Sequence, residues 1–339
     1  MAEAMCGQIL QGNRLSVERS YAELAGIPVD QDWTPEPPPP ATRQVTIGSP
    51  VSVTGPGTFF GKASRTLNFE PTTQEGWWFA RTDLPDALPI RVSVNTVWTT
   101  QRNIVLCSGS PHNYMRMVEH IIALRNGLEI DNLMIRMDSG DPPLFDRGSA
   151  DLVEALDRAG RQTVDQPVKW VTVREPVTVS SPSGGILTFH PPADAQRRIL
   201  DIDCGVNFKS AIGRQRLRVR VTPETFRHGA QARTNAPFLS MLFCKTIGQL
   251  FADWRNLGYT TRNILIAGRW KYFNPPRIEH QGKALEAVWH RTMMDLLAAI
   301  ALIDVGRFVG RVTSYKAGHA LDVQMIRLLY QKKLLVELD

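Results

Sequence analysis

Two stretches of this sequence repeat one pattern, and the repeat limits the folds that the chain can adopt. VTIGSPVSVTGPG (Val45–Gly57) is followed by LNFEP (Leu67–Pro71), and VTVREPVTVSSPSGG (Val171–Gly185) is followed by LTFHP (Leu187–Pro191). Each stretch predicts a strand, a turn rich in proline and glycine, and further strand, ending in an aromatic residue and a proline.

A second pair of similar segments follows in the same order. RNGLEIDNLMI (Arg125–Ile135) and RNLGYTTRNILI (Arg255–Ile266) each predict a helix end, a glycine turn and an apolar strand. Two repeats in one order favour an internal duplication, with halves at 43–167 and 168–339. Chance similarity between short apolar strands is the alternative.

Each half predicts several strands followed by helices, which is the pattern of the α+β class. Apolar residues at helical spacing predict helices over Asp151–Ala159, Leu285–Ala301 and Ala320–Tyr330. We therefore expect two duplicated α+β domains at 43–167 and 168–339, each a β-sheet layered on helices, with the helix layers packed together.

The first 42 residues differ in composition from the rest. PEPPPP (Pro35–Pro40) predicts a stiff, extended spacer, and an amphipathic helix is expected around Leu15–Ala25. We expect residues 1–42 to form an N-terminal extension that is not part of the main fold.

The charge pattern bears on the kinds of partner. The 339 residues are 43% hydrophobic and 21% charged, which is ordinary for a globular protein. The net charge of +6 is spread without runs of lysine or arginine, so no nucleic-acid partner is expected. A mildly basic surface suits an anionic substrate or a peripheral contact with the anionic inner face of a membrane.

The cysteines and apolar segments indicate the compartment. Four cysteines without disulfide or metal spacing lie in or near apolar runs, as reduced intracellular cysteines do: Cys6, Cys107, Cys204 and Cys244. No signal peptide is visible, and the longest apolar stretch, Met293–Val305, is too short to span a bilayer. We expect a cytoplasmic monomer.

Polar residues interrupt three segments that are otherwise apolar. Glu119 and His120 lie within a predicted helix, His290 precedes Asp295 by five residues, and His319 lies at a helix start after a glycine turn. Two histidines and one carboxylate are a common zinc set, and a catalytic zinc leaves one position for water. A further carboxylate takes the proton of that water, and a third histidine protonates the leaving group.

Each of these residues could instead have a purely structural role. A histidine in an apolar helix is most often a hydrogen-bonded core residue, and Asp295 fits the surface of a helix equally well. Spacing alone leaves both interpretations open. An unpaired carboxylate in a core is costly, which favours a functional interpretation of Glu119.

Residues 43–330 resemble the UDP-3-O-acyl-N-acetylglucosamine deacetylases, the zinc amidases of lipid A biosynthesis in Gram-negative bacteria. The segments that carry the resemblance include TGPGTFFGK (Thr54–Lys62), MVEHIIALRNGLEIDN (Met117–Asn132), IGRQRLRV (Ile212–Val219), ART (Ala232–Thr234), EAVWH (Glu286–His290) and YKAGHALDVQMIRLL (Tyr315–Leu329). The resemblance implies two α+β domains of one kind, with the site between their helix layers.

The resemblance also implies the ligands of a zinc ion. His120 and His290 would bind Zn²⁺, and an aspartate downstream of His290 would be the third ligand. The family spaces that pair at four residues, whereas Asp295 follows His290 at five and Met294 holds the expected position. A π-bulge of one residue would restore a common face, and we expect Asp295 to be the ligand.

Catalytic roles are implied for three further residues. Glu119 would be the general base, His319 the general acid for the departing amine or a stabiliser of developing charge, and Thr234 a hydrogen-bond donor to the oxyanion. The aspartate that orients the acid histidine in the family has no clear counterpart. Asp304 or Asp322 would have to replace it.

Four positions are expected to bind the substrate. Phe59 and Asn235 replace a histidine and a phenylalanine of the family, Arg291 replaces a lysine, and Lys316 follows the family pattern. We expect Arg291 to meet the phosphates of a nucleotide-sugar lipid, and Lys316 to meet the phosphates or the developing charge.

The expected function is zinc-dependent hydrolysis of the N-acetyl amide of UDP-3-O-acyl-N-acetylglucosamine, with release of acetate. The departures leave two alternatives open. One is a paralogous zinc amidase that acts on another N-acylated amino sugar. The other is a catalytically inactive relative retained for binding.

Overall fold

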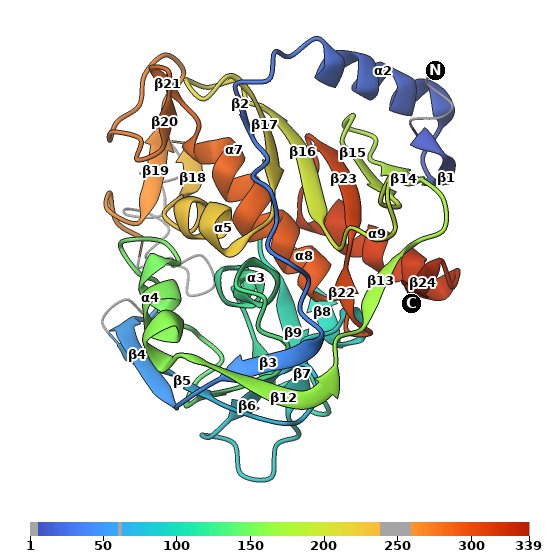
Figure 1. Cartoon of the computed structure of the whole chain (residues 1–339). Helices are drawn as coiled ribbons and strands as arrows, with labels where there is room; N and C mark the ends of the chain where they lie inside the picture. Colours follow the sequence, from blue (N-terminus) through green and yellow to red (C-terminus); the bar gives the residue numbers. More distant parts are fainter. Residues whose placement is uncertain (1–5, 60–62, 238–258, 339) are drawn as a thin grey trace.

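The computed structural model describes residues 6–59, 63–237 and 259–338 (Figure 1). Several β-sheets and helices of mixed order make up this part of the chain, so the predicted α+β class is confirmed. Among the described residues, no helix is both long enough and apolar enough to cross a membrane.

A five-stranded sheet holds strands from the first half of the chain. Its order is β4-β5-β11-β6-β7, and every neighbouring pair is antiparallel except β11 with β6. The strands are β4 (Val51–Pro56), β5 (Ser64–Glu70), β11 (Leu133–Met137), β6 (Trp77–Arg81) and β7 (Ile90–Arg91). The last of these strands in the chain, β11, therefore lies at the centre of the sheet.

A seven-stranded sheet holds strands from the second half and from the N-terminal segment. Its order is β1-β14-β15-β23-β16-β17-β2. The strands are β1 (Gln8–Gln11), β14 (Val177–Ser180), β15 (Ile186–His190), β23 (Gly310–Tyr315), β16 (Leu200–Asn207), β17 (Arg214–Arg220) and β2 (Gln31–Trp33). From β14 to β17, the order of strands and the single parallel pair, β23 with β16, repeat the pattern of the five-stranded sheet.

The remaining strands form smaller sheets of two or three strands. They pair β3 (Arg43–Ile47) with β12 (Arg161–Pro167), β13 (Trp170–Val173) with β22 (Arg307–Phe308) and β24 (Leu335–Leu338), β9 (Val105–Cys107) with β8 (Val97–Thr99) and β10 (Tyr114–Met115), β18 (Thr234–Pro237) with β19 (Ile264–Ala267), and β20 (Glu279–His280) with β21 (Lys283–Ala284).

The helices lie between and around the sheets. They are α2 (Arg14–Ala25), α3 (Glu119–Gly127), α4 (Ala150–Ala159), α5 (Pro223–Gly229), α7 (Glu286–His290), the π-helix Arg291–Leu296, α8 (Leu297–Ala301) and α9 (His319–Gln331), with a short 3-10 turn at Val94–Thr96. Helix α3 of the first half packs against the π-helix and α8 of the second half, and α8 packs against α9.

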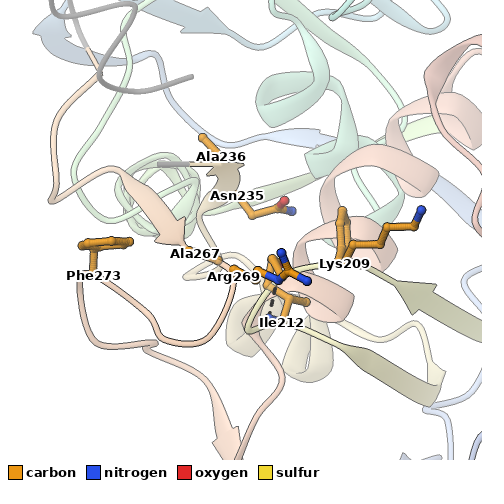
Figure 2. A pocket seen from close by; sticks show the side chains of 10 residues that line it. Lys209, Ile212, Asn235, Ala236, Ala267, Arg269 and Phe273 are labelled. Carbon is orange, nitrogen blue, oxygen red and sulfur yellow. Dashed lines mark hydrogen bonds between the residues drawn. The ribbon is translucent and has the colours of Figure 1, made fainter. Parts of the chain in front are cut away.

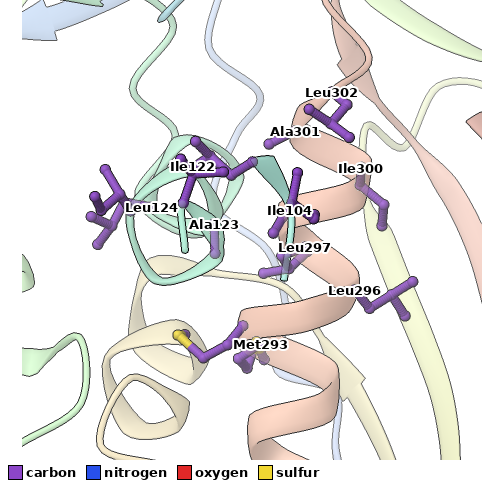
Figure 3. Close-up of a cluster of buried hydrophobic side chains, with 14 of the residues drawn as sticks. Ile104, Ile122, Ala123, Leu124, Met293, Leu296, Leu297, Ile300, Ala301 and Leu302 are labelled. Carbon is purple, nitrogen blue, oxygen red and sulfur yellow. The ribbon is translucent and has the colours of Figure 1, made fainter. Parts of the chain in front are cut away.

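The apolar core joins the two halves at this helix contact. Ile122 and Ala123 on α3 lie beside the helix that carries Met293, Leu297 and Ala301 (Figure 3), and all five side chains are buried. Burying one of the larger side chains stabilises a fold by about 1.5–3 kcal/mol, so this contact holds the two halves firmly together.

The second pair of similar segments was predicted to place equivalent strands in the two halves, and this prediction is wrong. β11 lies within the five-stranded sheet, whereas β19, its expected counterpart, pairs with β18 outside the seven-stranded sheet. The strand that matches β11 in position is β23. Arg255–Gly258 of this repeat lie outside the described residues.

The N-terminal segment was predicted to lie outside the main fold, and this prediction is also wrong. Strand β1 pairs in parallel with β14, and β2 pairs in parallel with β17, so the segment supplies both edges of the seven-stranded sheet. The predicted helix is present as α2, whose N-terminus is capped by the Asn13 side chain at 2.8 Å from Ser16 N. Val17 and Leu24 of α2 are buried with Ile186 and Tyr315 of the sheet.

Candidate active site

Two histidines from different halves of the chain face each other across the helix contact. His120 lies in the first turn of α3, and His290 is the last residue of α7. Their Nε2 atoms are 3.4 Å apart and their ring centroids 5.1 Å. The Thr234 hydroxyl at the start of β18 lies 3.2 Å from His120 Nε2 and 3.0 Å from His290 Nε2.

Both imidazoles are neutral at physiological pH. Burial, reinforced by the neighbouring His290, lowers the pKa of His120 to about 3. Burial also lowers the pKa of His290, although the nearby Asp295 carboxylate acts in the opposite direction. Neutral rings keep a nitrogen lone pair free for a metal ion.

The helix after His290 is bulged, which is the arrangement that would let Asp295 share a face with His290 across the five-residue gap. Residues Arg291–Leu296 form a π-helix, and the Asp295 carboxylate lies 3.6 Å from Nδ1 of His290. Burial raises the pKa of Asp295, but the nearby His290 and His319 lower it more, so the net shift is downward. Met294 instead accepts a hydrogen bond at its Sδ from the Ser149 hydroxyl at 3.1 Å.

Glu119 and His319 lie on the same side of this group. Glu119 is 3% exposed, its Oε1 accepts a 2.5 Å hydrogen bond from Ile104 N, and it lies 3.5 Å from His319 Nε2. His319, the first residue of α9, is also 3.7 Å from Asp295 Oδ1. Glu119 Oε2 and His319 Nδ1 are buried and have no hydrogen-bond partner within the described part of the chain.

The carboxylates determine the charge on His319. Burial alone lowers its pKa, but Asp295 and Glu119 raise it more, and the net shift is upward. Burial raises the pKa of Glu119, opposed by His319. The arrangement therefore places a proton acceptor and a proton donor side by side next to the two imidazoles.

Neither of the two aspartates considered as replacements forms a hydrogen bond with His319. Asp322 accepts hydrogen bonds of 2.6 and 2.7 Å from Arg291, and Asp304 accepts one of 2.5 Å from the Tyr330 hydroxyl. Within residues 6–59, 63–237 and 259–338, Asp295 and Glu119 are the only carboxylates in ion-pair range of the His319 ring.

The two cations expected to meet phosphate are held elsewhere. Arg291 is 6% exposed and forms a bidentate ion pair with Asp322, so its guanidinium is not directed at a substrate. Lys316 donates to Glu23 of α2 at 2.6 Å. Sequence reasoning missed both pairs because each partner is remote in the chain.

Phe59 and Asn235 lie in separate places. The Phe59 ring stacks under the Arg116 guanidinium, 3.7 Å from the ring centroid, and its backbone N–H donates to Asp141. Asn235 follows Thr234 on β18 and lines a cavity (Figure 2).

This cavity has a volume of about 840 Å³ and a mostly apolar lining. Phe208 and Phe273 supply aromatic rings to the lining. Lys209 and Arg269 supply cations (Figure 2). No ion pair is formed by either cation with the described residues. Lys209 and Arg269 lie in loops without a motif, so no sequence signal pointed to them.

The residues present fit a zinc ion in part. Two nitrogens bound to one tetrahedral zinc at 2.0–2.1 Å lie about 3.4 Å apart, which matches the separation of the two Nε2 atoms. The Thr234 hydroxyl is adjacent to both. In the described ranges, however, no three side chains of histidine, cysteine, aspartate or glutamate converge into a complete metal centre.

Comparisons with known proteins show which family the chain belongs to. A model of the family LpxC, UDP-3-O-acyl N-acetylglycosamine deacetylase, matches residues 44–331. The UDP-3-O-acyl-N-acetylglucosamine deacetylase of Brucella ovis is 28% identical over 291 residues, which cover 84% of this chain and 94% of the relative. The enzyme of the same name from Brucella melitensis biotype 2 gives the same values. The chain belongs to the UDP-3-O-acyl N-acetylglycosamine deacetylase family.

Proposed function

We propose that this chain hydrolyses the N-acetyl amide of UDP-3-O-acyl-N-acetylglucosamine and releases acetate, a step of lipid A biosynthesis. The observation that carries the proposal is the pair of facing imidazoles, His120 and His290, whose Nε2 atoms are 3.4 Å apart beside Glu119 and His319. Family membership supplies the substrate class.

His120, His290 and Asp295 would hold a zinc ion. The chemistry that zinc supplies when bound is polarisation of the amide carbonyl and a lower pKa for a bound water. Asp295 lies 3.6 Å from Nδ1 of His290 on the face that the π-helix creates.

Three residues would carry the proton and charge transfers. Glu119 Oε2 has no hydrogen-bond partner within the described residues, so it is available to accept the proton of the attacking water. His319, 3.5 Å from Glu119, would donate a proton to the departing amine. The Thr234 hydroxyl would donate a hydrogen bond to the oxyanion that forms at the amide carbon.

The cavity next to Thr234 would receive the UDP group. Its aromatic rings, Phe208 and Phe273, suit a nucleobase, and Lys209 and Arg269 suit a diphosphate. Lys209 and Arg269 would bind the phosphates in place of Arg291, because Arg291 is buried in an ion pair with Asp322.

Another N-acylated amino sugar is the second candidate substrate. Asn235 lines the cavity at the position where the family pattern has a phenylalanine, and Phe59 stacks on Arg116 instead of offering an imidazole. Both changes alter the surface available to the sugar or its acyl chain. A catalytically inactive relative is the third reading of the same site.

Acetate release and zinc content distinguish these functions. Purified protein is assayed with UDP-3-O-acyl-N-acetylglucosamine and with a panel of N-acetylated sugars, and its zinc is measured beside that of His120→Ala. We expect zinc near one ion per chain, lost in the variant, and acetate from the UDP-sugar. Acetate from another sugar only would favour the second candidate, and a lack of both zinc and acetate the third.

The wider assignments follow from the same proposal. We infer that the two halves arose by duplication, since their central five strands share one order and one parallel pair. We also infer a cytoplasmic monomer that contacts the inner membrane face when it takes up its lipid-linked substrate.

A further inference from the structure

A second hollow lies on the outer face of the seven-stranded sheet. It has a volume of about 480 Å³ and is lined by the end of β15 and by the starts of β16 and β23. Leu187 and Phe189 of β15 point into the main core, so His190, next in the alternation, faces the opposite side. Helix α2 covers the same face, where Tyr21 donates to Thr188 at 2.5 Å.

A row of charged residues crosses the floor of this hollow. His190 is opposite Arg311, Arg311 is opposite Asp201, and Asp201 is opposite Arg220 in the register of the four strands. Directly opposite residues of neighbouring strands have side chains within about 4.5–5.5 Å at Cβ, so these groups share one surface.

Most charges in the hollow are already compensated. Arg220 forms a bidentate pair with Asp201, at 2.8 and 3.2 Å. Arg197 pairs with Glu36 at 2.6 Å, and Asp194 accepts a hydrogen bond from Gln196 N. Arg311 forms no ion pair or side-chain hydrogen bond with the part of the chain that the structure describes. Among the arginines that line the hollow, Arg311 is therefore the one without a carboxylate partner in the described part of the chain, and the Asp194 carboxylate there has no cationic partner.

The imidazole of His190 is buried and lacks a partner. His190 is 6% exposed, and its Nε2 has no hydrogen-bond partner among the described residues. Burial, reinforced by Arg311, lowers the pKa of this ring to about 4, so it is neutral. A buried polar atom without a partner costs about 1–3 kcal/mol, and a bound group that accepts a hydrogen bond would remove this cost.

We propose that this hollow binds a small phosphate-bearing molecule through the guanidinium of Arg311 and the imidazole of His190. A guanidinium binds phosphate oxygens by two parallel charge-assisted hydrogen bonds, and a neutral imidazole N–H donates to a third oxygen. The volume is within the range of small-molecule sites. The hollow lies on the sheet face opposite the helices that carry His120 and His290, and it is independent of the proposed deacetylation.

Calorimetric titration of the zinc-loaded full chain with inorganic phosphate and with glycerol 3-phosphate tests this site. We expect saturable binding, weakened about tenfold or more in Arg311→Gln and about threefold or more in His190→Phe. Arg174→Gln is the matched control, because Arg174 is also exposed and forms no ion pair or side-chain hydrogen bond with the described residues. We expect its affinity and the acetate release of R311Q to equal those of the wild type.

The outcomes separate cleanly. Absence of saturable binding, or equal weakening by R174Q and R311Q, would overturn the proposal. Sedimentation with vesicles that contain phosphatidic acid, lost in R311Q, would identify a lipid headgroup as the source of the phosphate. Binding of glycerol 3-phosphate without vesicle binding would identify a soluble ester. In NMR spectra of protein with isotope-labelled histidine, the His190 imidazole signal is identified by its absence in H190F. We expect the chemical shift of this signal to change on titration with phosphate.

Discussion

At the scale of single residues, Arg291 shows how a buried ion pair can resemble a substrate contact in sequence. It directly follows a predicted zinc ligand and replaces a lysine of the family, yet its two terminal nitrogens donate hydrogen bonds to Asp322 on α9. The pair ties the π-helix to α9, the helix that begins at His319. Arg291 therefore acts on the site through packing.

Arg291→Met should destabilise the fold strongly. Removing one partner of a buried ion pair leaves the other uncompensated and costs about 3–5 kcal/mol. Urea unfolding measures the change in the free energy of unfolding. Arg291→Met combined with Asp322→Leu should recover most of the loss. If R291M keeps the stability of the wild type but has a higher KM for the UDP-sugar, Arg291 contacts the substrate, as the sequence predicted.

Thr234→Val tests a second single residue. Loss of one oxyanion donor lowers kcat by about 10²–10³ in enzymes of known mechanism. We expect such a fall in T234V, with zinc content unchanged, and a substantial recovery in Thr234→Ser. If T234V instead loses zinc, the hydroxyl supports the metal site and not the oxyanion.

At the scale of elements, the π-helix decides which acidic residue faces the histidines. In a regular helix, five residues are about 140° around the axis, and Asp295 would point away from His290. The extra residue turns Asp295 toward His290 and directs Met294 to Ser149. The resemblance to the family raised the possibility of such a bulge, because the family's four-residue ligand spacing is longer by one residue here, but the sequence alone did not decide whether the helix is bulged.

The zinc content of variants tests whether position 295 or position 294 supplies the third zinc ligand. We expect Asp295→Ala to lose most of its zinc, since a third ligand is removed. Adding Met294→Asp to that variant should not restore zinc, because position 294 points to Ser149. Full zinc in D295A, or rescue by M294D, would show that the ligand assignment is wrong.

Other elements could not be predicted from the sequence. β1 is QILQ, four residues without alternation, and its pairing depends on a sheet edge formed by residues almost 170 positions away. The segment RNLGYTTRNILI resembles Arg125–Ile135 in local pattern, but strand partners depend on tertiary contacts, and β19 pairs with β18. Local motifs with a chemical requirement, such as Glu119–His120, were easier to identify.

At the scale of the whole molecule, the N-terminal segment closes the seven-stranded sheet. It begins before the stretch that matches the family, residues 44–331, yet it supplies both edge strands and one helix. Glu23 of α2 accepts hydrogen bonds from Lys316 and Tyr315, close in sequence to His319. The segment therefore stabilises the sheet from which the loop before α9 departs.

Leu24→Ala tests whether this segment is integral to the fold. Leu24 is 2% exposed and fits over Gly205, where a Cβ would lie 2.5 Å from Leu24 Cδ1. Truncating a buried leucine to alanine costs about 2–5 kcal/mol in stability. Leu15→Ala on the same helix is the control, because Leu15 is 76% exposed and its loss should change little. Equal urea midpoints for L24A, L15A and the wild type would mean that α2 adds nothing to global stability, and the extension would then be an appendage, as the sequence alone suggested.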